Sequence, residues 1–410
     1  MKDKFIMVAG VGASKFLQLL FSLYLSYQFD HGALATFVLI LTLSIAMSSI
    51  VSLGGAPQIV RAGAFSDSKK HIISTVGTAL ILIALVLIAL FLYVAFGQHD
   101  FGVRGFNKFD YYFNTAFILT SLALYSIVQS YLSYKQEYFK LGVSTFVIYS
   151  APFLLAVVLS QLGFNVAAVI FVYSLTFLLS SLFVYFFTVN KEIRFNDVIS
   201  SLPGFGVLKV NIANFIRVSL FGFITMLSLY FSVKYVNNNF DEQKIAVYSV
   251  SFQFFQIGTF LPGVLGSVFI PKIIESKGSQ YQYNKMRKVY ALIAIFWFLS
   301  CLIMVYPVFK IYQFNISSDL LSTFFIMQFC VLLSSLQAFY NQKYVAHGSF
   351  GILSVSAIIW GAVLLILQVL LPVDLFMSSV SILLAYISSL IFFKVISVVC
   401  PNNYLKYEGN

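Results

Sequence analysis

The sequence predicts an all-α polytopic membrane protein with twelve transmembrane helices in two six-helix lobes around a central cavity. Sixty per cent of its 410 residues are hydrophobic and 10% are charged, and the mean hydropathy is +0.92. A water-soluble fold needs more polar surface than this composition supplies. Apolar stretches such as 75–96 also lack the alternation of a membrane β-strand, which favours helices.

Twelve apolar segments of about 20 residues follow one another, each long enough to cross a hydrocarbon core of about 30 Å. A polar stretch divides them into two sets of six, which predicts an N-terminal lobe over 1–190, a cytoplasmic linker over 191–209 and a C-terminal lobe over 210–410. The predicted spans are 5–29, 34–58, 72–96, 111–134, 141–160, 166–189, 210–233, 244–270, 289–310, 320–342, 350–371 and 375–397.

The basic residues predict the orientation. An even number of spans places both termini on one side of the membrane. If that side is cytoplasmic, 18 of the 25 lysines and arginines lie in cytoplasmic segments, five lie on the opposite side and two lie within helices. This asymmetry follows the positive-inside rule. The first segment has the basic flank of a signal peptide, but it carries Lys15 inside its apolar region, so we expect it to be retained as a helix.

Lys15 lies near the middle of the first predicted span. At about 1.5 Å of rise per residue, it lies about 16 Å into a helix that enters the membrane at Lys4. A cation at the bilayer centre costs at least about 2.5 kcal/mol, so such a residue usually faces the helix bundle or a watery cavity. Gln18, Ser22 and Ser26 continue the same helical face. The alternative is that Lys15 extends its amine to the membrane surface.

Arg217 is the second cation inside a predicted span, and Asn211 and Asn214 precede it by six and three residues. No aspartate or glutamate falls within any of the twelve spans. Because intramembrane cations normally pair with intramembrane acids, the substrate is a candidate for the missing counter-charge. Arginine and lysine both suit phosphate oxygens, which predicts a phosphate or diphosphate group. The alternative is that each cation bonds only to backbone carbonyls or water.

The two halves of the chain share an order of features. In the first half, the span with Lys15 is followed by one that ends near Pro57, and then by a basic loop. In the second half, the span with Arg217 is followed by one that ends near Pro271, and then by another basic loop. Six spans in each half imply two repeats of the same orientation, with the substrate path between them.

Arg61 follows Pro57 by four residues, at the predicted cytoplasmic rim. It is either a substrate contact or an interfacial anchor.

Neutral polar residues recur at helical spacing in two further spans: Ser249, Gln253 and Gln256 in the eighth, and Ser334, Gln337 and Asn341 in the tenth. Such residues bind sugar hydroxyls along a hydrated path or, more often, join neighbouring helices.

The sequence gives little sign of an enzyme. The largest predicted outer loop, 97–110, offers only His99, Asp100 and Asp110 as catalytic candidates. The four histidines lie in different loops and form no metal-ligand set, and there is no glycine-rich phosphate loop. We therefore predict no cofactor, no metal and no nucleic-acid partner.

Three features carry a resemblance to a family: twelve spans in two lobes with a cation in the first span, the Leu53-Gly54-Gly55-Ala56-Pro57 turn leading to Arg61, and the link Ser133-Tyr134-Lys135-Gln136-Glu137-Tyr138. The chain resembles bacterial O-antigen and polysaccharide flippases of the multidrug/oligosaccharidyl-lipid/polysaccharide exporter superfamily. The resemblance implies alternating-access transfer of an undecaprenyl-diphosphate-linked oligosaccharide from the cytoplasmic to the periplasmic leaflet of the inner membrane. It also implies work beside other polysaccharide-assembly proteins.

The resemblance assigns the diphosphate and sugars to Lys15, Arg61 and Arg217, and Gln18 and Asn214 complete the predicted set. Two other functions remain open. A cation-coupled multidrug exporter would need an intramembrane acid, which the predicted spans lack. A polysaccharide polymerase would need a larger outer domain that carries acidic residues.

Overall fold

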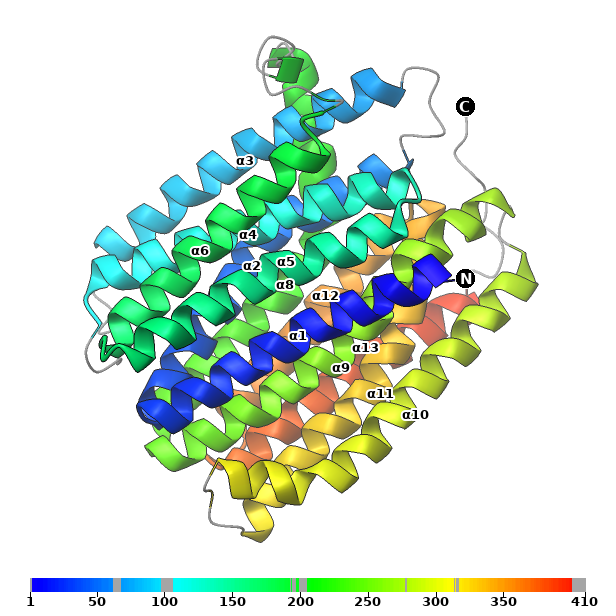
Figure 1. Ribbon diagram of the computed structural model, residues 1–410. Coiled ribbons are helices and arrows are strands. Elements are labelled where there is room, and N and C mark those ends of the chain that lie inside the picture. Colours follow the sequence, from blue (N-terminus) through cyan, green and yellow to red (C-terminus); the bar gives the residue numbers. More distant parts are fainter. Residues whose placement is uncertain are drawn as a thin grey trace. The chain divides into compact units, whose positions relative to one another are not determined.

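The computed structural model describes residues 2–61, 68–96, 106–191, 193, 197–198, 205–276, 279–312, 314 and 317–399. These residues form twelve long helices and no strand, which confirms the all-α class (Figure 1). The first six are α1 (Lys2–Gln28), α2 (His31–Arg61), α3 (Ser68–Phe96), α4 (Lys108–Tyr134), α5 (Tyr138–Gln161) and α6 (Val166–Thr188). The second six are α8 (Phe205–Asn239), α9 (Glu242–Glu275), α10 (Gln280–Ile311), α11 (Ser318–His347), α12 (Phe350–Leu370) and α13 (Leu375–Val399).

Eleven of these helices are long and apolar enough to cross a membrane, as judged over the described residues. The remaining helix, α9, includes residues whose side chains lie outside the described part of the chain, and its sequence carries no charged residue between Lys244 and Lys272. Several helices are longer than the predicted spans; α8 starts at Phe205 rather than at 210, and α10 starts at Gln280 rather than at 289. A helix satisfies its own backbone groups, so it can continue past the apolar region that hydropathy detects.

Local sequence signals set several helix ends. Asn107 caps α4 in a capping box with Asp110, and the side chains of Asn165 and Ser317 cap α6 and α11. α11 ends at Gly348, whose φ of 75° is the left-handed conformation that glycine adopts without strain.

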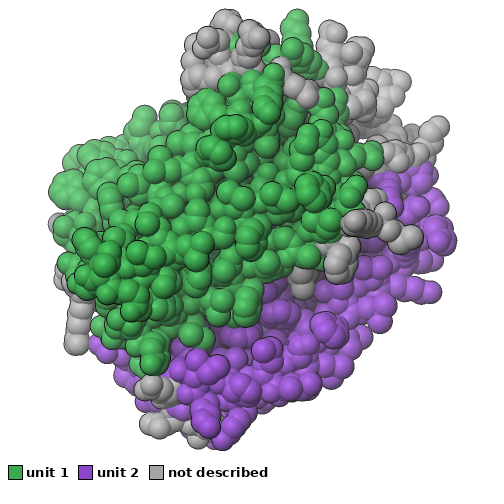
Figure 2. All heavy atoms as spheres, in the orientation of Figure 1, with its two compact units in different colours: residues 1–227 green, residues 228–410 purple. Residues whose placement is uncertain are grey.

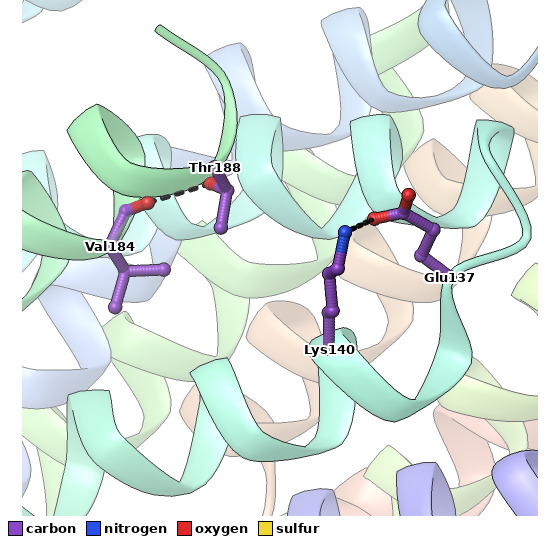
Figure 3. Close-up of polar contacts among 4 residues, drawn as sticks. All are labelled: Glu137, Lys140, Val184 and Thr188. Atoms are coloured by element: carbon purple, nitrogen blue, oxygen red, sulfur yellow. Dashed lines mark hydrogen bonds and ion pairs between the residues drawn. The ribbon is translucent and has the colours of Figure 1, made fainter. Parts of the chain in front are cut away.

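The predicted link after α4 forms a tight turn in which Gln136 has a φ of 58°. Glu137 and Lys140 form an ion pair of 2.8 Å at the start of α5, and nearby on α6 the Thr188 hydroxyl donates to the Val184 carbonyl at 2.6 Å (Figure 3). The link between α4 and α5, which carries part of the family resemblance, is therefore a tight turn held by local contacts.

The last five helices of each set of six pack in the same order. In the first half, α2 packs on α4, α4 on α6, α5 on α6, and α3 on both α2 and α4. In the second half, α9 packs on α11, α11 on α13, α12 on α13, and α10 on both α9 and α11. Each pair therefore has its counterpart seven helix labels later, which supports the predicted internal repeat.

The chain divides into two compact units, Met1–Leu227 (unit 1) and Ser228–Asn410 (unit 2) (Figure 2). The division falls inside α8. In unit 1, the Asn211 amide of α8 donates to Ser74 Oγ of α3 at 2.9 Å. In unit 2, the Ser232 hydroxyl of α8 lies 2.8 Å from the Tyr248 hydroxyl of α9. The lobe boundary at 191–209 stays a prediction, as does the central cavity.

Candidate functional site: a lysine at the centre of α1

Lys15 lies at the midpoint of α1, equally far along the chain from Lys2 and from Gln28. Its side chain is half-buried. The amine donates to Gln18 Oε1 at 3.0 Å and to the Tyr149 hydroxyl of α5 at 3.4 Å. It also lies 5.1 Å from the centre of the Tyr149 ring, within the range of a cation–π interaction. The amine is therefore held between α1 and α5 at the middle of α1.

Glycines bring α1 against α5. A Cβ atom added at Gly10 would lie 2.5 Å from the Gly142 carbonyl oxygen, and one added at Gly142 would lie 2.7 Å from the Ile6 oxygen. Such close approach of two backbones is typical of small residues at membrane helix contacts. Near the other end of the pair, Gln161 Nε2 donates to the Tyr24 hydroxyl at 3.0 Å. The two helices therefore run side by side in the same direction, with Lys15 opposite Tyr149 (Figure 1).

Aromatic side chains surround Tyr149. Its ring packs edge-on to Tyr125 of α4 at 6.2 Å and against Phe177 of α6 at 5.0 Å. The Tyr125 hydroxyl lies 3.0 Å from Thr145 Oγ1, which joins α4 to α5. Tyr149 is 3% exposed, so its position is fixed on all sides by the interior of unit 1. A fixed acceptor of this kind holds the lysine amine in one place.

No acidic residue lies at the depth of Lys15 in any of the twelve helices. Their five acidic residues all lie at helix ends: Asp3, Asp110, Glu242, Glu275 and Asp319. The two partners of Lys15 named above are both neutral. Among the residues that the structure describes, no three metal-ligating side chains gather as they would around an ion. The arrangement can attract an anion into the protein interior.

The two serines of the predicted α1 face, Ser22 and Ser26, have other bonding partners. Ser22 is fully buried and donates to the Gln18 carbonyl at 3.1 Å. The Ser26 hydroxyl lies 2.8 Å from Nδ1 of His31, where α2 begins. The structure thus brings the side chains of Lys15 and Gln18 together, whereas Ser22 bonds to the Gln18 backbone and Ser26 to His31.

Arg217 lies in the first half of α8, and its side chain is exposed. No contact joins it to Lys15 or Gln18 in the described part of the chain. On the same helix, Asn211 donates to Ser74 and Thr78 of α3, at 2.9 and 3.4 Å. The side chains of Asn214 and Arg61 lie outside the described residues; Arg61 is the last residue of α2.

Tyr149 was missed by the sequence analysis, because it is separated from Lys15 by 134 residues and stands in an apolar helix. The signal that could have indicated it is the pair Gly10 and Gly142, since small residues in apolar helices mark close helix contacts.

Comparisons with known proteins agree on the fold. No protein-family model and no curated protein sequence matches this chain. Solved structures do match it over nearly its whole length. One is described as the outward-facing conformation of a multidrug resistance MATE family transporter of the MOP superfamily; it is 14% identical, with a TM-score of 0.70, and the match covers 98% of this chain and 96% of that one.

The inward-facing conformation of a MATE transporter matches with a TM-score of 0.67 and 13% identity, over 98% of this chain and 96% of that one. A third match is a MOP superfamily transporter from Pyrococcus furiosus, at 14% identity and a TM-score of 0.72, covering 97% and 95% of the two chains. Its description states that reverse polarity of the binding pocket suggests a different function. The chain therefore has the two-lobe fold of these transporters, which supports a multi-pass membrane protein.

Proposed function

We propose that this protein is a transporter that carries an anionic, lipid-linked substrate across the membrane by alternating access of its two lobes. The observation that carries the proposal is the Lys15 amine, held at mid-helix by neutral Gln18 and Tyr149. A cation this deep in an apolar helix usually faces the bundle interior or a watery cavity and marks a substrate path. An anionic substrate matches the charge of this site, and no acidic residue lies in the interior of the twelve helices.

The substrate class is a polyprenyl-diphosphate-linked oligosaccharide such as an O-antigen or capsule repeat unit. A diphosphate concentrates negative charge that one lysine can meet as a point charge. The lipid tail stays in the bilayer, and the direction is from the cytoplasmic to the periplasmic leaflet of a bacterial inner membrane. Gln18 belongs to the same site through its bond to Lys15, whereas Arg61, Asn214 and Arg217 are candidates for later contacts along the path.

The fold is compatible with a change in substrate charge. The description of the Pyrococcus furiosus transporter connects reversed pocket polarity with a different function in the same superfamily. A lysine at the centre of α1 gives this chain a basic site, which supports an anionic substrate.

Multidrug export is the second candidate function, because the inward-facing and outward-facing matches are both described as multidrug resistance transporters. Of the two candidates, the comparisons favour this one and the Lys15 site favours the first. An exporter of cationic drugs would gain affinity from an acidic residue at depth, and none lies in the interior of the twelve helices.

Surface glycan display tests the proposal. A strain that lacks the protein receives wild type, Lys15→Arg, Lys15→Ala or Arg217→Ala at matched protein abundance, and both glycan display and drug susceptibility are measured. Wild type and Lys15→Arg are expected to restore display, and Lys15→Ala is expected to fail. Restored drug resistance without any effect on glycan display would establish multidrug export instead, and full complementation by Lys15→Ala would remove Lys15 from the site.

A further inference from the structure

Five described glutamines of unit 2 are more than nine-tenths buried: three of them join helices, and Gln253 and Gln337 each have one amide atom without a hydrogen-bond partner among the described residues. Gln328 of α11 donates to the Ser251 carbonyl of α9 at 3.1 Å and accepts from Trp297 Nε1 of α10 at 3.2 Å. Gln342 of α11 donates to the Pro262 carbonyl of α9 at 2.9 Å. Gln368 of α12 donates to Ser232 Oγ of α8 at 2.6 Å. These three side chains have the structural role that buried glutamines usually have in membrane bundles.

Gln253 of α9 is different. It is 4% exposed, and its Nε2 atom has no hydrogen-bond partner among the described residues. Ser249, one helical turn earlier on the same face, is 1% exposed, and its hydroxyl also lacks a partner there. Buried polar groups are nearly always hydrogen-bonded, and an unpaired one is destabilising relative to an apolar side chain. Two such groups one turn apart therefore indicate a ligand that supplies the missing bonds.

The position of Gln253 excludes a role in joining α9 to α11. The side of α9 that faces α11 is marked by Gly258, where an added Cβ would lie 2.8 Å from Val331 Cγ1, and by Gly266, where it would meet Gln342 Nε2. At about 100° per residue, Gln253 lies about 140° around the helix from each glycine. The face that carries Ser249 and Gln253 thus turns away from the contact that the bridging glutamines hold.

The chemistry of this face is neutral. Gln256, three residues after Gln253 on the same face, is partly exposed, and no charged residue occurs between Lys244 and Lys272. The serine hydroxyl both donates and accepts a hydrogen bond, and the glutamine amide supplies a further donor. A hydroxyl group of a ligand also donates and accepts, so it can pair with either side chain. An anion would find no cation on this face, and an apolar molecule would leave both buried groups unpaired. Sugar hydroxyls satisfy both.

We propose that the α9 face formed by Ser249, Gln253 and Gln256 binds the uncharged sugar part of the substrate. This inference rests on the proposed function and extends it: the Lys15 site in unit 1 holds the diphosphate, and the α9 face in unit 2 holds sugar hydroxyls. Recognition of a lipid-linked glycan is then divided between two sites of different chemistry, each in its own compact unit.

Binding of two lipids to the purified, full-length protein tests this division. The probes are undecaprenyl diphosphate without sugar and the same lipid carrying the oligosaccharide of the source strain. Gln253→Met is expected to weaken binding of the glycan-bearing lipid about tenfold and to leave binding of the sugar-free lipid unchanged. Lys15→Gln is expected to weaken binding of both lipids. Ser249→Ala combined with Gln253→Met should enlarge the difference between the two lipids.

Thermal stability separates a binding role from a structural one. Gln253→Met removes an unpaired buried amide, so it should leave the melting temperature unchanged or raise it. The matched variant Gln328→Met removes two bonds between helices and should lower the melting temperature. A lowered melting temperature for Gln253→Met, or an equal effect of this substitution on both lipids, would overturn the sugar site. The effect of Lys15→Gln on binding of both lipids would still test the proposed function separately. Failure of wild type to bind either lipid would overturn both proposals together.

Discussion

Lys15 and Arg217 occupy comparable positions in the two halves of the chain, and the structure gives them different surroundings. Lys15 lies at the midpoint of α1, and Arg217 lies in the first half of α8, the helix that opens the second set of six. The lysine is half-buried and bonded to Gln18 and Tyr149. The arginine is exposed. The same sequence signal, a cation inside an apolar span, therefore corresponds to a fixed interior side chain at Lys15 and to an exposed side chain at Arg217.

This difference shows that the packing of neighbouring helices decides whether an intramembrane cation is held in one position. Lys15 is fixed because Gly10 and Gly142 allow α5 to approach α1 and to place Tyr149 beside the amine. On α8, Asn211 and Ser232 bond to neighbouring helices, whereas Arg217 is exposed. A fixed, desolvated cation is expected to bind a phosphate more strongly than an exposed one, because screening by water is weaker in the interior.

The largest expected effect is on anion binding. With farnesyl diphosphate as the probe, Lys15→Gln should weaken binding at least tenfold, since a hydrogen bond to a charged group contributes about 1.5–3 kcal/mol. Arg217→Gln should weaken it by less than about fivefold, because an exposed pair contributes at most about 1 kcal/mol. Titration calorimetry of the purified protein measures both. Equal losses would show that the two cations bind the diphosphate alike.

The next effect concerns the helix contact that fixes Lys15. Gly10→Ala places a methyl group 2.5 Å from a backbone oxygen of α5, so we expect a loss of about 1–3 kcal/mol of stability from overpacking. Gly12→Ala is the matched control, because a Cβ atom there meets nothing within 4 Å. Thermal unfolding in detergent compares the two. Equal melting temperatures for both variants would show that α1 and α5 do not need this close approach.

A smaller effect is expected from the Tyr149 hydroxyl. Tyr149→Phe keeps the ring beside the amine and removes one acceptor, so it should lower the free energy of unfolding by about 1 kcal/mol. In a Lys15→Met background the same substitution should have almost no effect, because the donor is gone. A double-mutant cycle on thermal stability gives this coupling directly. Additive effects of the two substitutions would mean that the bond at 3.4 Å contributes nothing.

The smallest effect is expected at the α4–α5 link. Glu137 and Lys140 form an ion pair, but their side chains are 37% and 61% exposed. Glu137→Gln should therefore change the free energy of unfolding by less than about 0.5 kcal/mol and leave transport unchanged. The same thermal assay and glycan display measure this. A large loss of display with normal stability would assign the link a role in the transport cycle that its geometry does not predict.

Much of the fold was predictable from the sequence because the bilayer restricts the possible structures. Long apolar segments without period-two alternation predict membrane helices, and the order of features in both halves predicts the repeat that the packing supports. The starts of α8 and α10 were placed too far along the chain, because hydropathy detects the apolar part of a helix and not its polar extension. The lobe boundary at 191–209 stays a prediction, and α8 contributes residues to both compact units.

The cation at the centre of the first helix and the lack of an acid at its depth could be predicted from the sequence, since both depend only on position along a helix. Which cation is held, and by which side chains, depends on how the helices pack. Tyr149 reaches Lys15 from another helix, and Gln253 differs from Gln328 only in what its neighbours offer. Contacts between distant segments arise when helices pack, and a side chain's partners follow from that packing rather than from its own residue type.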